Sequence, residues 1–221
     1  MVVCDGLTIQ DCAGVYEEFA KIFLNEPTDE SIGQARAFLR MFQEDDPLSS
    51  ERATEDALEG AALQQRYYDR FLVPSSKWYI PLSENSVKRA CLTDAGWVFG
   101  PTTGPDSLHV LECYHAAHFD FRALRGFAPL VESVRADALV VEVTFMAYLK
   151  QHEAQSASGE DASRWNCFAQ QFLAAHLGGW LGKVVTIMDS TENDFYFEVV
   201  CALARWVQSQ TAENLNQETV S

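Results

Sequence analysis

The stretch Asp137-Ala-Leu-Val-Val-Glu-Val-Thr-Phe-Met146 decides the fold of this chain. From Leu139 to Leu149 the sequence is apolar on nearly every side of a helix, which is typical of a helix at the centre of a globular protein. Glu142 is the exception, and we expect it to have a partner because an unpaired buried charge is costly. The candidate partners are Arg135, Arg70, Lys77 and a cationic ligand.

The central helix is expected to run from about Val134 to Glu153, with Asp137 as a cap near its start. Helical periodicity also dominates the other segments, because apolar residues recur at three- and four-residue spacing. Several helix starts are marked by capping boxes, in which a Ser or Thr precedes an acidic residue by three positions. These boxes begin at Thr8, Ser158 and Thr191.

The sequence therefore predicts an all-α fold class: a single globular bundle of about nine or ten helices. No convincing strand is found. A helix is expected from near Ser49 to about Leu72, a break over Gly96 to Gly104, and a break or bend at Gly178-Gly179. The stretch near 96–105 is a candidate hinge, but composition does not change across it. We therefore favour one domain over residues 1–208 and a polar, frayed tail over 209–221.

The chain is strongly acidic. Its 221 residues contain 16 Lys plus Arg and 32 Asp plus Glu, which gives a formal net charge of −16. This balance argues against nucleic acid, whose phosphates require a basic protein surface, and favours cationic partners, including peptides that carry arginines. Solubility alone is an alternative explanation of the charge.

The N-terminus lacks a secretory signal and no run is long enough for a membrane helix, so we expect a cytoplasmic protein without a membrane span. The six cysteines include no CxxC pair and are expected to be reduced. The sequence predicts no catalytic residue, no metal site and no cofactor.

A second unusual segment is the loop that follows Tyr68-Asp-Arg-Phe-Leu-Val-Pro74. The side chains of Tyr68, Phe71 and Leu72 share one helix face just before the chain leaves the helix. Two prolines, Pro74 and Pro81, stiffen the loop that follows. Trp78 lies between the prolines. A rigid aromatic loop beside an apolar helix end is suited to binding an apolar peptide. The alternative is a buried structural loop, in which Arg70 pairs with Glu84.

Together with Phe172-Leu-Ala-Ala-His-Leu-Gly-Gly-Trp180, these two segments resemble the signature of the redox-enzyme maturation chaperones, the TorD/DmsD/NarJ family. The matching residues of the loop segment are Tyr68, Phe71, Leu72, Pro81, Glu84 and Ser86. The matching residues of the central helix are Asp137, Glu142, Phe145 and Met146. Asn85 is an extra residue relative to the family pattern, and Ala138 stands where the family has a histidine.

This resemblance implies a chaperone without catalytic activity. Its partner would be the leader peptide or N-terminal region of a molybdopterin oxidoreductase catalytic subunit, held before cofactor insertion and export. The residues implied in peptide binding are Tyr68, Phe71, Leu72, Trp78, Pro81, Glu84, Ser86 and Asp137. Those implied in support of the site are Arg70, Glu142, Phe145, Met146, His176 and Trp180.

Two alternatives stay open at this point. One is a helical adaptor or regulator that binds a folded partner. The other is a small metal- or thiol-dependent enzyme, for which Cys113, His115 and His118 are the candidate residues. His176 is expected to be a core histidine that bonds a backbone carbonyl. The sequence identifies neither the client enzyme nor its kind of leader, and both monomer and dimer are compatible with it.

Overall fold

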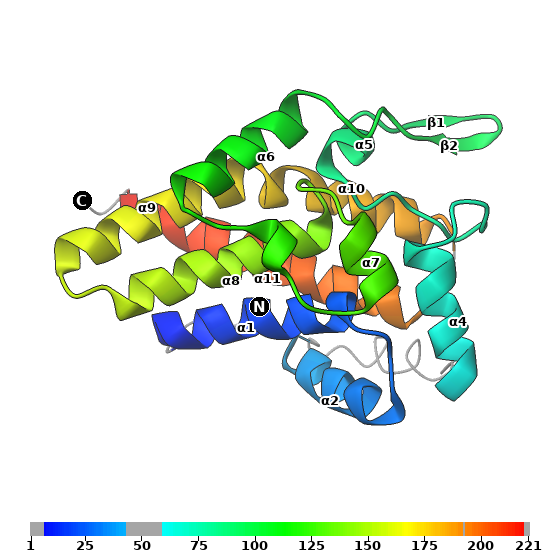
Figure 1. The fold of residues 1–221 in the computed structure, drawn as a ribbon, viewed down its shortest axis with the longest axis horizontal. Coiled ribbons are helices and arrows are strands. Elements are labelled where there is room, and N and C mark those ends of the chain that lie inside the picture. The colour runs from blue at the N-terminus through cyan, green and yellow to red at the C-terminus, as the bar shows by residue number, and fades with distance from the viewer. Residues whose placement is uncertain (1–6, 43–58, 192, 219–221) are drawn as a thin grey trace.

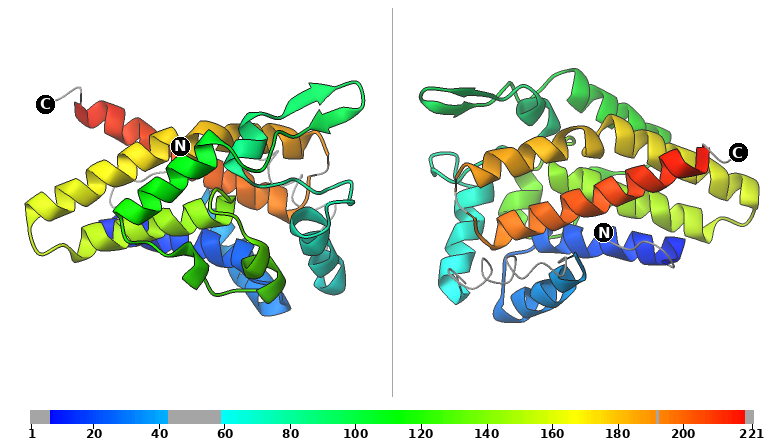
Figure 2. Two further views of the ribbon diagram at one scale, coloured as in Figure 1. Left: turned by 45° about the horizontal axis from the view of Figure 1, so that its top comes forward. Right: turned by 180° about the vertical axis from the view of Figure 1, so that it is seen from behind.

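The computed structural model describes residues 7–42, 59–191 and 193–218. In this part of the chain the protein is a single bundle of helices with one short hairpin (Figures 1 and 2), which confirms the all-α prediction. The ten α-helices of the described residues agree with the expected nine or ten. In chain order the elements are α1 (Ile9–Leu24), α2 (Asp29–Leu39), η1 (Arg40–Phe42), α4 (Gly60–Phe71), α5 (Glu84–Lys88), β1 (Cys91–Thr93), β2 (Gly96–Val98), α6 (Pro105–Ala116), η2 (Phe121–Ala123), α7 (Ala128–Ser133), α8 (Leu139–Gln155), α9 (Gly159–Ala175), α10 (Leu177–Asp189) and α11 (Phe195–Glu218).

Helix α8 lies in the centre of the bundle, as its apolar sequence predicted (Figure 1). Helix α1 packs along α8, α9 packs on it as well, and α10 and α11 pack against α9 and each other. Phe145 of α8 is completely buried, and its ring contacts the rings of Tyr114, Phe119 and Phe172. Met146 is buried in the same core. Neither α8 nor any other described helix is long and apolar enough to cross a membrane.

The central helix begins at Leu139 rather than near Val134. The backbone at Val134 and Ala138 is extended, so the residues before Leu139 approach the helix as irregular chain. The predicted cap was also wrong, because Ala138 is the N-cap and Asp137 makes no cap to α8. The Asp137 carboxylate is bound by the loop before α5 instead, which explains why the helix does not include it.

The capping box at Thr8 is confirmed, whereas at Ser158 only the N-cap half of the expected box is present. The Asp11 amide donates to the Thr8 hydroxyl at 3.1 Å, and the Asp161 amide donates to the Ser158 hydroxyl at 3.2 Å. The box at Thr191 was wrong, because that hydroxyl donates to the Met188 carbonyl at the end of α10. The helix start expected near Ser49 lies outside the described residues.

A short antiparallel hairpin, β1–β2, extends from the helical body (Figures 1 and 2), although the sequence showed no convincing strand. Its strands are three residues each, too short for an alternating apolar pattern. The turn is closed by Gly96, whose φ of +108° favours glycine. The Trp97 indole donates to the Ser190 hydroxyl at 2.9 Å and fastens the hairpin to the end of α10. The single-domain boundary, the hinge and the tail stay predictions.

A buried ion-pair cluster joins α4 to the start of α11. The Asp194 Oδ2 atom accepts from Arg66 Nη1 and from Arg70 Nε, both at 2.7 Å. The Asp194 Oδ1 atom accepts from the Phe197 amide at 3.0 Å, which caps α11. The expected pairing of Arg70 with Glu84 was therefore wrong, since Arg70 points toward α11 and is 1% exposed.

Replacing Asp194 should destabilise the fold strongly. The change Asp194→Ala removes the carboxylate that pairs with two buried guanidinium groups, and it also removes the cap of α11. We therefore expect the free energy of unfolding to fall by about 3–5 kcal/mol. Chemical denaturation followed by circular dichroism measures this loss. The exposed Asp189→Ala is the matched control and should change stability by less than about 0.5 kcal/mol. Equal effects of the two changes would contradict the assignment.

Candidate functional site

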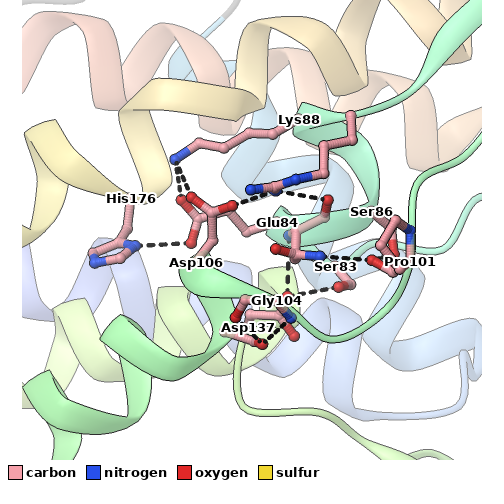
Figure 3. Close-up of polar contacts among 12 residues, drawn as sticks. Ser83, Glu84, Ser86, Lys88, Pro101, Gly104, Asp106, Asp137 and His176 are labelled. Carbon is pink, nitrogen blue, oxygen red and sulfur yellow. Dashed lines mark hydrogen bonds and ion pairs between the residues drawn. The ribbon is translucent and has the colours of Figure 1, made fainter.

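The two unusual segments of the sequence lie against each other just before α8 (Figure 3). A short antiparallel bridge joins Ser83 to Ala138. The Glu84 amide donates to the Asp137 carbonyl at 2.8 Å, and the Leu139 amide donates to the Leu82 carbonyl at 2.9 Å. Residues that are more than fifty positions apart in the chain thus form one site.

The Asp137 carboxylate caps α5 from across this bridge (Figure 3). Its Oδ2 atom accepts a hydrogen bond from the Ser83 hydroxyl at 2.7 Å and another from the Asn85 amide at 3.0 Å. The Asn85 amide belongs to the first turn of α5 and has no carbonyl partner within that helix. Asp137 is completely buried, so its role in this structure is to hold the start of α5 against the start of α8.

Asn85 and Ser86 bind the segment that follows the hairpin. The Asn85 side-chain amide donates to the Pro101 carbonyl at 2.7 Å, and the Ser86 hydroxyl donates to the same carbonyl at 3.3 Å. Gly104 lies so close that a Cβ atom there would stand 2.3 Å from Asn85 Oδ1. Asn85, which is extra relative to the family pattern, is completely buried. Its backbone amide binds Asp137 and its side-chain amide binds Pro101.

Glu84 is the centre of a charged cluster (Figure 3). Its Oε1 atom forms an ion pair with Lys88 one turn later in α5, and its Oε2 atom lies 2.8 Å from His176 Nδ1. Lys88 also binds Asp106 of α6 at 3.2 Å and the Ala175 carbonyl at the end of α9. Glu84 is completely buried. These contacts connect α5, α6 and the α9–α10 junction through one carboxylate.

His176 forms the junction between α9 and α10. Its backbone, with φ −116° and ψ −98°, interrupts the helix one residue before α10 begins, so the predicted break at Gly178-Gly179 is displaced to His176. Gly178 permits the close approach that follows, since a Cβ atom there would stand 2.8 Å from the Leu173 carbonyl oxygen. The expectation that His176 bonds a backbone carbonyl was wrong: its ring nitrogens contact Glu84 and His109.

Glu142 has a neutral partner. Trp180 Nε1 donates to Glu142 Oε2 at 3.0 Å, while the three basic residues that were candidates for it bind elsewhere. The prediction of Arg135, Arg70 or Lys77 as the partner was therefore wrong. Burial, together with the negative charge of nearby Glu84, raises the pKa of Glu142 well above its ordinary value of 4.5. The raised pKa favours the neutral form of the carboxyl group, which has less need of a counter-ion than a carboxylate.

An apolar cavity of about 400 Å³ opens beside the bridge. Both unusual segments contribute to its wall: Phe71, Leu72, Pro81 and Leu82 from the loop segment, and Ala138, Leu139 and Val140 from the segment at the start of α8. Leu130 of α7 contributes to the facing wall, together with Val134, which precedes α8. Three of the predicted peptide-binding residues thus line one cavity, and its lining is mainly apolar.

The other predicted binding residues lie outside the cavity lining. Tyr68 stacks on the Phe127 ring, with centroids 5.9 Å apart. Trp78 lies under the Arg66 guanidinium at 4.0 Å and the Lys77 ammonium at 4.3 Å. Glu84, Ser86 and Asp137 are buried in the polar contacts behind the bridge. The sequence-predicted set therefore divides into a cavity wall, flanking aromatics and a polar support.

Sequence reasoning assigned no role in the site to Lys88, Asp106 or His109. Lys88 carried one available signal, because Glu84 and Lys88 are four residues apart on a short helix and such pairs interact. His109 and Cys113 are also four residues apart, on α6. Asp106 had no local signal, since its ion pairs with Lys88 and Arg89 join separate elements.

The match of the chain to a family model places it in the TorD/NarJ class of redox-enzyme maturation chaperones. Residues 24–186 match the family model described as nitrate reductase delta subunit, and the chain belongs to that family. The family comprises maturation chaperones of molybdenum enzymes rather than catalysts. No curated protein and no solved structure matches the chain.

The raised pKa of Glu142 makes a prediction about the pH dependence of stability. Above about pH 4.5 the unfolded chain loses a proton that the folded chain keeps at Glu142, so this group lowers the free energy of unfolding as pH rises. The change Glu142→Gln keeps a neutral group that can accept from Trp180 and removes this dependence. We expect the variant to gain stability relative to the parent as pH increases from 4.5 toward 7, measured by urea denaturation at a series of pH values.

The control for this comparison is Glu112→Gln on the exposed surface of α6, which should leave the pH dependence close to that of the parent. Parallel stability curves for Glu142→Gln and the parent over the whole range would show that Glu142 is ionised in the folded protein.

Proposed function

We propose that this protein is a system-specific chaperone for the catalytic subunit of a molybdopterin oxidoreductase. It binds the leader peptide or another immature apolar segment of that subunit in the cavity beside the Ser83–Ala138 bridge. It acts in the cytoplasm, where binding delays export and keeps the client open for insertion of its cofactor. No bond is made or broken in this role.

The cavity is the observation that carries the proposal. Its volume of about 400 Å³ lies within the range of about 300–1,000 Å³ that is typical of ligand pockets. Its wall joins both segments that resemble the chaperone signature, and apolar side chains dominate it. Apolar side chains of an extended peptide would leave water on entering it, which supplies a favourable free energy without a specific chemical group.

The buried carboxylates support the cavity rather than enter it. Glu84 and Asp137 are completely buried and have partners within the protein. Glu84 forms an ion pair with Lys88, and Asp137 accepts a hydrogen bond from Ser83. A peptide arginine would have to displace these partners to reach them. In this proposal the arginines of a leader are attracted by the acidic surface, through a net charge of −16, while the apolar part of the leader enters the cavity.

Calorimetric titration with leader peptides from the molybdenum enzymes of the same genome tests the proposal. Control peptides carry glutamine in place of each arginine pair, and each titration is run at low and high salt. We expect one leader to bind, with the arginine contribution lost at high salt and the apolar contribution retained. Failure of every leader and every immature segment to bind would favour the helical adaptor that binds a folded partner.

Filling the cavity should weaken this binding. Ala138 lines the cavity with a single methyl group, and Ala138→Phe places a ring inside it. We expect the dissociation constant of the bound leader peptide to rise at least about tenfold, which corresponds to ~1.4 kcal/mol. The affinity is measured by calorimetry, and circular dichroism verifies that the variant is folded.

The matched control is Ala116→Phe, which adds the same ring at an exposed position near the end of α6. This variant should bind the leader as the parent does. If Ala138→Phe is folded and keeps the parental affinity, the peptide binds at another surface.

A further inference from the structure

Two histidines and one cysteine converge on the far side of Glu84 from the bridge. His109 and Cys113 are four residues apart on α6, so their side chains lie on the same side of that helix. His176, at the α9–α10 junction, reaches the same point. Their three potential ligand atoms all lie within 4.8 Å of one another. The sequence had grouped Cys113 with His115 and His118, which are exposed and line a different cavity.

The spacing of these atoms is close to that of a tetrahedral metal site. His109 Nδ1 lies 2.8 Å from His176 Nε2, and the largest separation in the group is 4.8 Å. Zinc bonds of about 2.0–2.1 Å to nitrogen and about 2.3 Å to sulfur place ligand atoms about 3.3–3.6 Å apart. The observed separations bracket these values. Because His109 is exposed on its helix, its side chain has room to make the small adjustment required.

The surroundings of His176 hold its ring in the orientation that a metal ligand needs. His176 Nδ1 lies 2.8 Å from Glu84 Oε2, so Nδ1 carries the proton and donates it to the carboxylate. Nε2 is then the nitrogen with the free lone pair, and it faces His109 and Cys113. Phe172 packs on the ring at a centroid distance of 4.8 Å. A carboxylate–histidine–metal arrangement of this kind fixes both tautomer and ring position.

We propose that His109, Cys113 and His176 form a binding site for a zinc ion, with Glu84 orienting His176. Two imidazoles and one thiolate are a ligand set that zinc prefers, and three protein ligands leave the fourth position to water. On binding, the Cys113 thiol releases its proton. The His109 proton moves from Nδ1 to Nε2, which frees Nδ1 for the metal. The ion joins α6 to the α9–α10 junction beside the proposed peptide site. The zinc site does not depend on peptide binding at that site.

Metal titration of the purified full chain tests the site. The protein is freed of metal with a chelator under reducing conditions, and Zn²⁺ binding is followed by competition with a chromophoric chelator. Co²⁺ serves as the spectroscopic probe, because a thiolate ligand gives a charge-transfer band and tetrahedral geometry gives intense visible bands. We expect one ion per chain, both Co²⁺ signatures, and a higher Tm with bound zinc.

The variants Cys113→Ser and His109→Ala identify the ligands. We expect Cys113→Ser to abolish the charge-transfer band, and each variant to weaken zinc binding at least about tenfold. Both positions are at least partly exposed, so the metal-free variants should fold, and circular dichroism verifies this. Cys167→Ser and His115→Ala are controls of the same chemistry at exposed positions and should bind zinc as the parent does.

Three outcomes would overturn the inference. They are the absence of zinc binding to the reduced chain, zinc binding that survives both Cys113→Ser and His109→Ala, and loss of binding in either control variant. None of these bears on peptide binding, which the leader titration decides separately.

Discussion

The bridge between Ser83 and Ala138 is the constraint on which the site depends. The loop from Leu72 to Leu82 contains no regular element of its own, and the two backbone hydrogen bonds of the bridge join its end to the start of the central helix. The Asp137 carboxylate strengthens this junction because it accepts from both the loop and α5. The cavity exists because these two segments are held side by side while α7 lies opposite.

Three completely buried carboxyl groups surround this junction, and each is stabilised in a different way. Asp137 accepts hydrogen bonds at a helix start, where the helix dipole favours negative charge. Glu84 has a cation, Lys88, and a histidine as partners. Glu142 accepts a hydrogen bond from the neutral Trp180 indole, and burial beside Glu84 raises its pKa, which favours the uncharged form. Burial of several acidic groups in so acidic a chain is thus consistent with a stable fold.

Local pattern in the sequence was sufficient for the helices and insufficient for the contacts between them. The apolar run of α8 predicted its central position because burial on all sides leaves no polar face. The predicted partners of Arg70 and Glu142 were wrong because the true partners depend on which elements pack together. These partners, Asp194 and Trp180, are distant in the chain, so no local pattern points to them. Resemblance to a family paired the two signature segments, whereas no local rule predicts the bridge between them. The capping role of Asp137 was missed for the same reason, because Asp137 caps α5 rather than α8, the helix that follows it.

Selectivity in the proposed function follows from where charge and volume lie. The carboxylates nearest the cavity are engaged inside the protein, so the acidic surface attracts any cationic leader with little discrimination. Discrimination must then come from the shape of the apolar cavity. At position 138 the family pattern has a histidine, whereas this chain has only a methyl group in the cavity wall. In the proposed function we therefore expect the space that a histidine ring would occupy to be filled by a larger apolar side chain of the client.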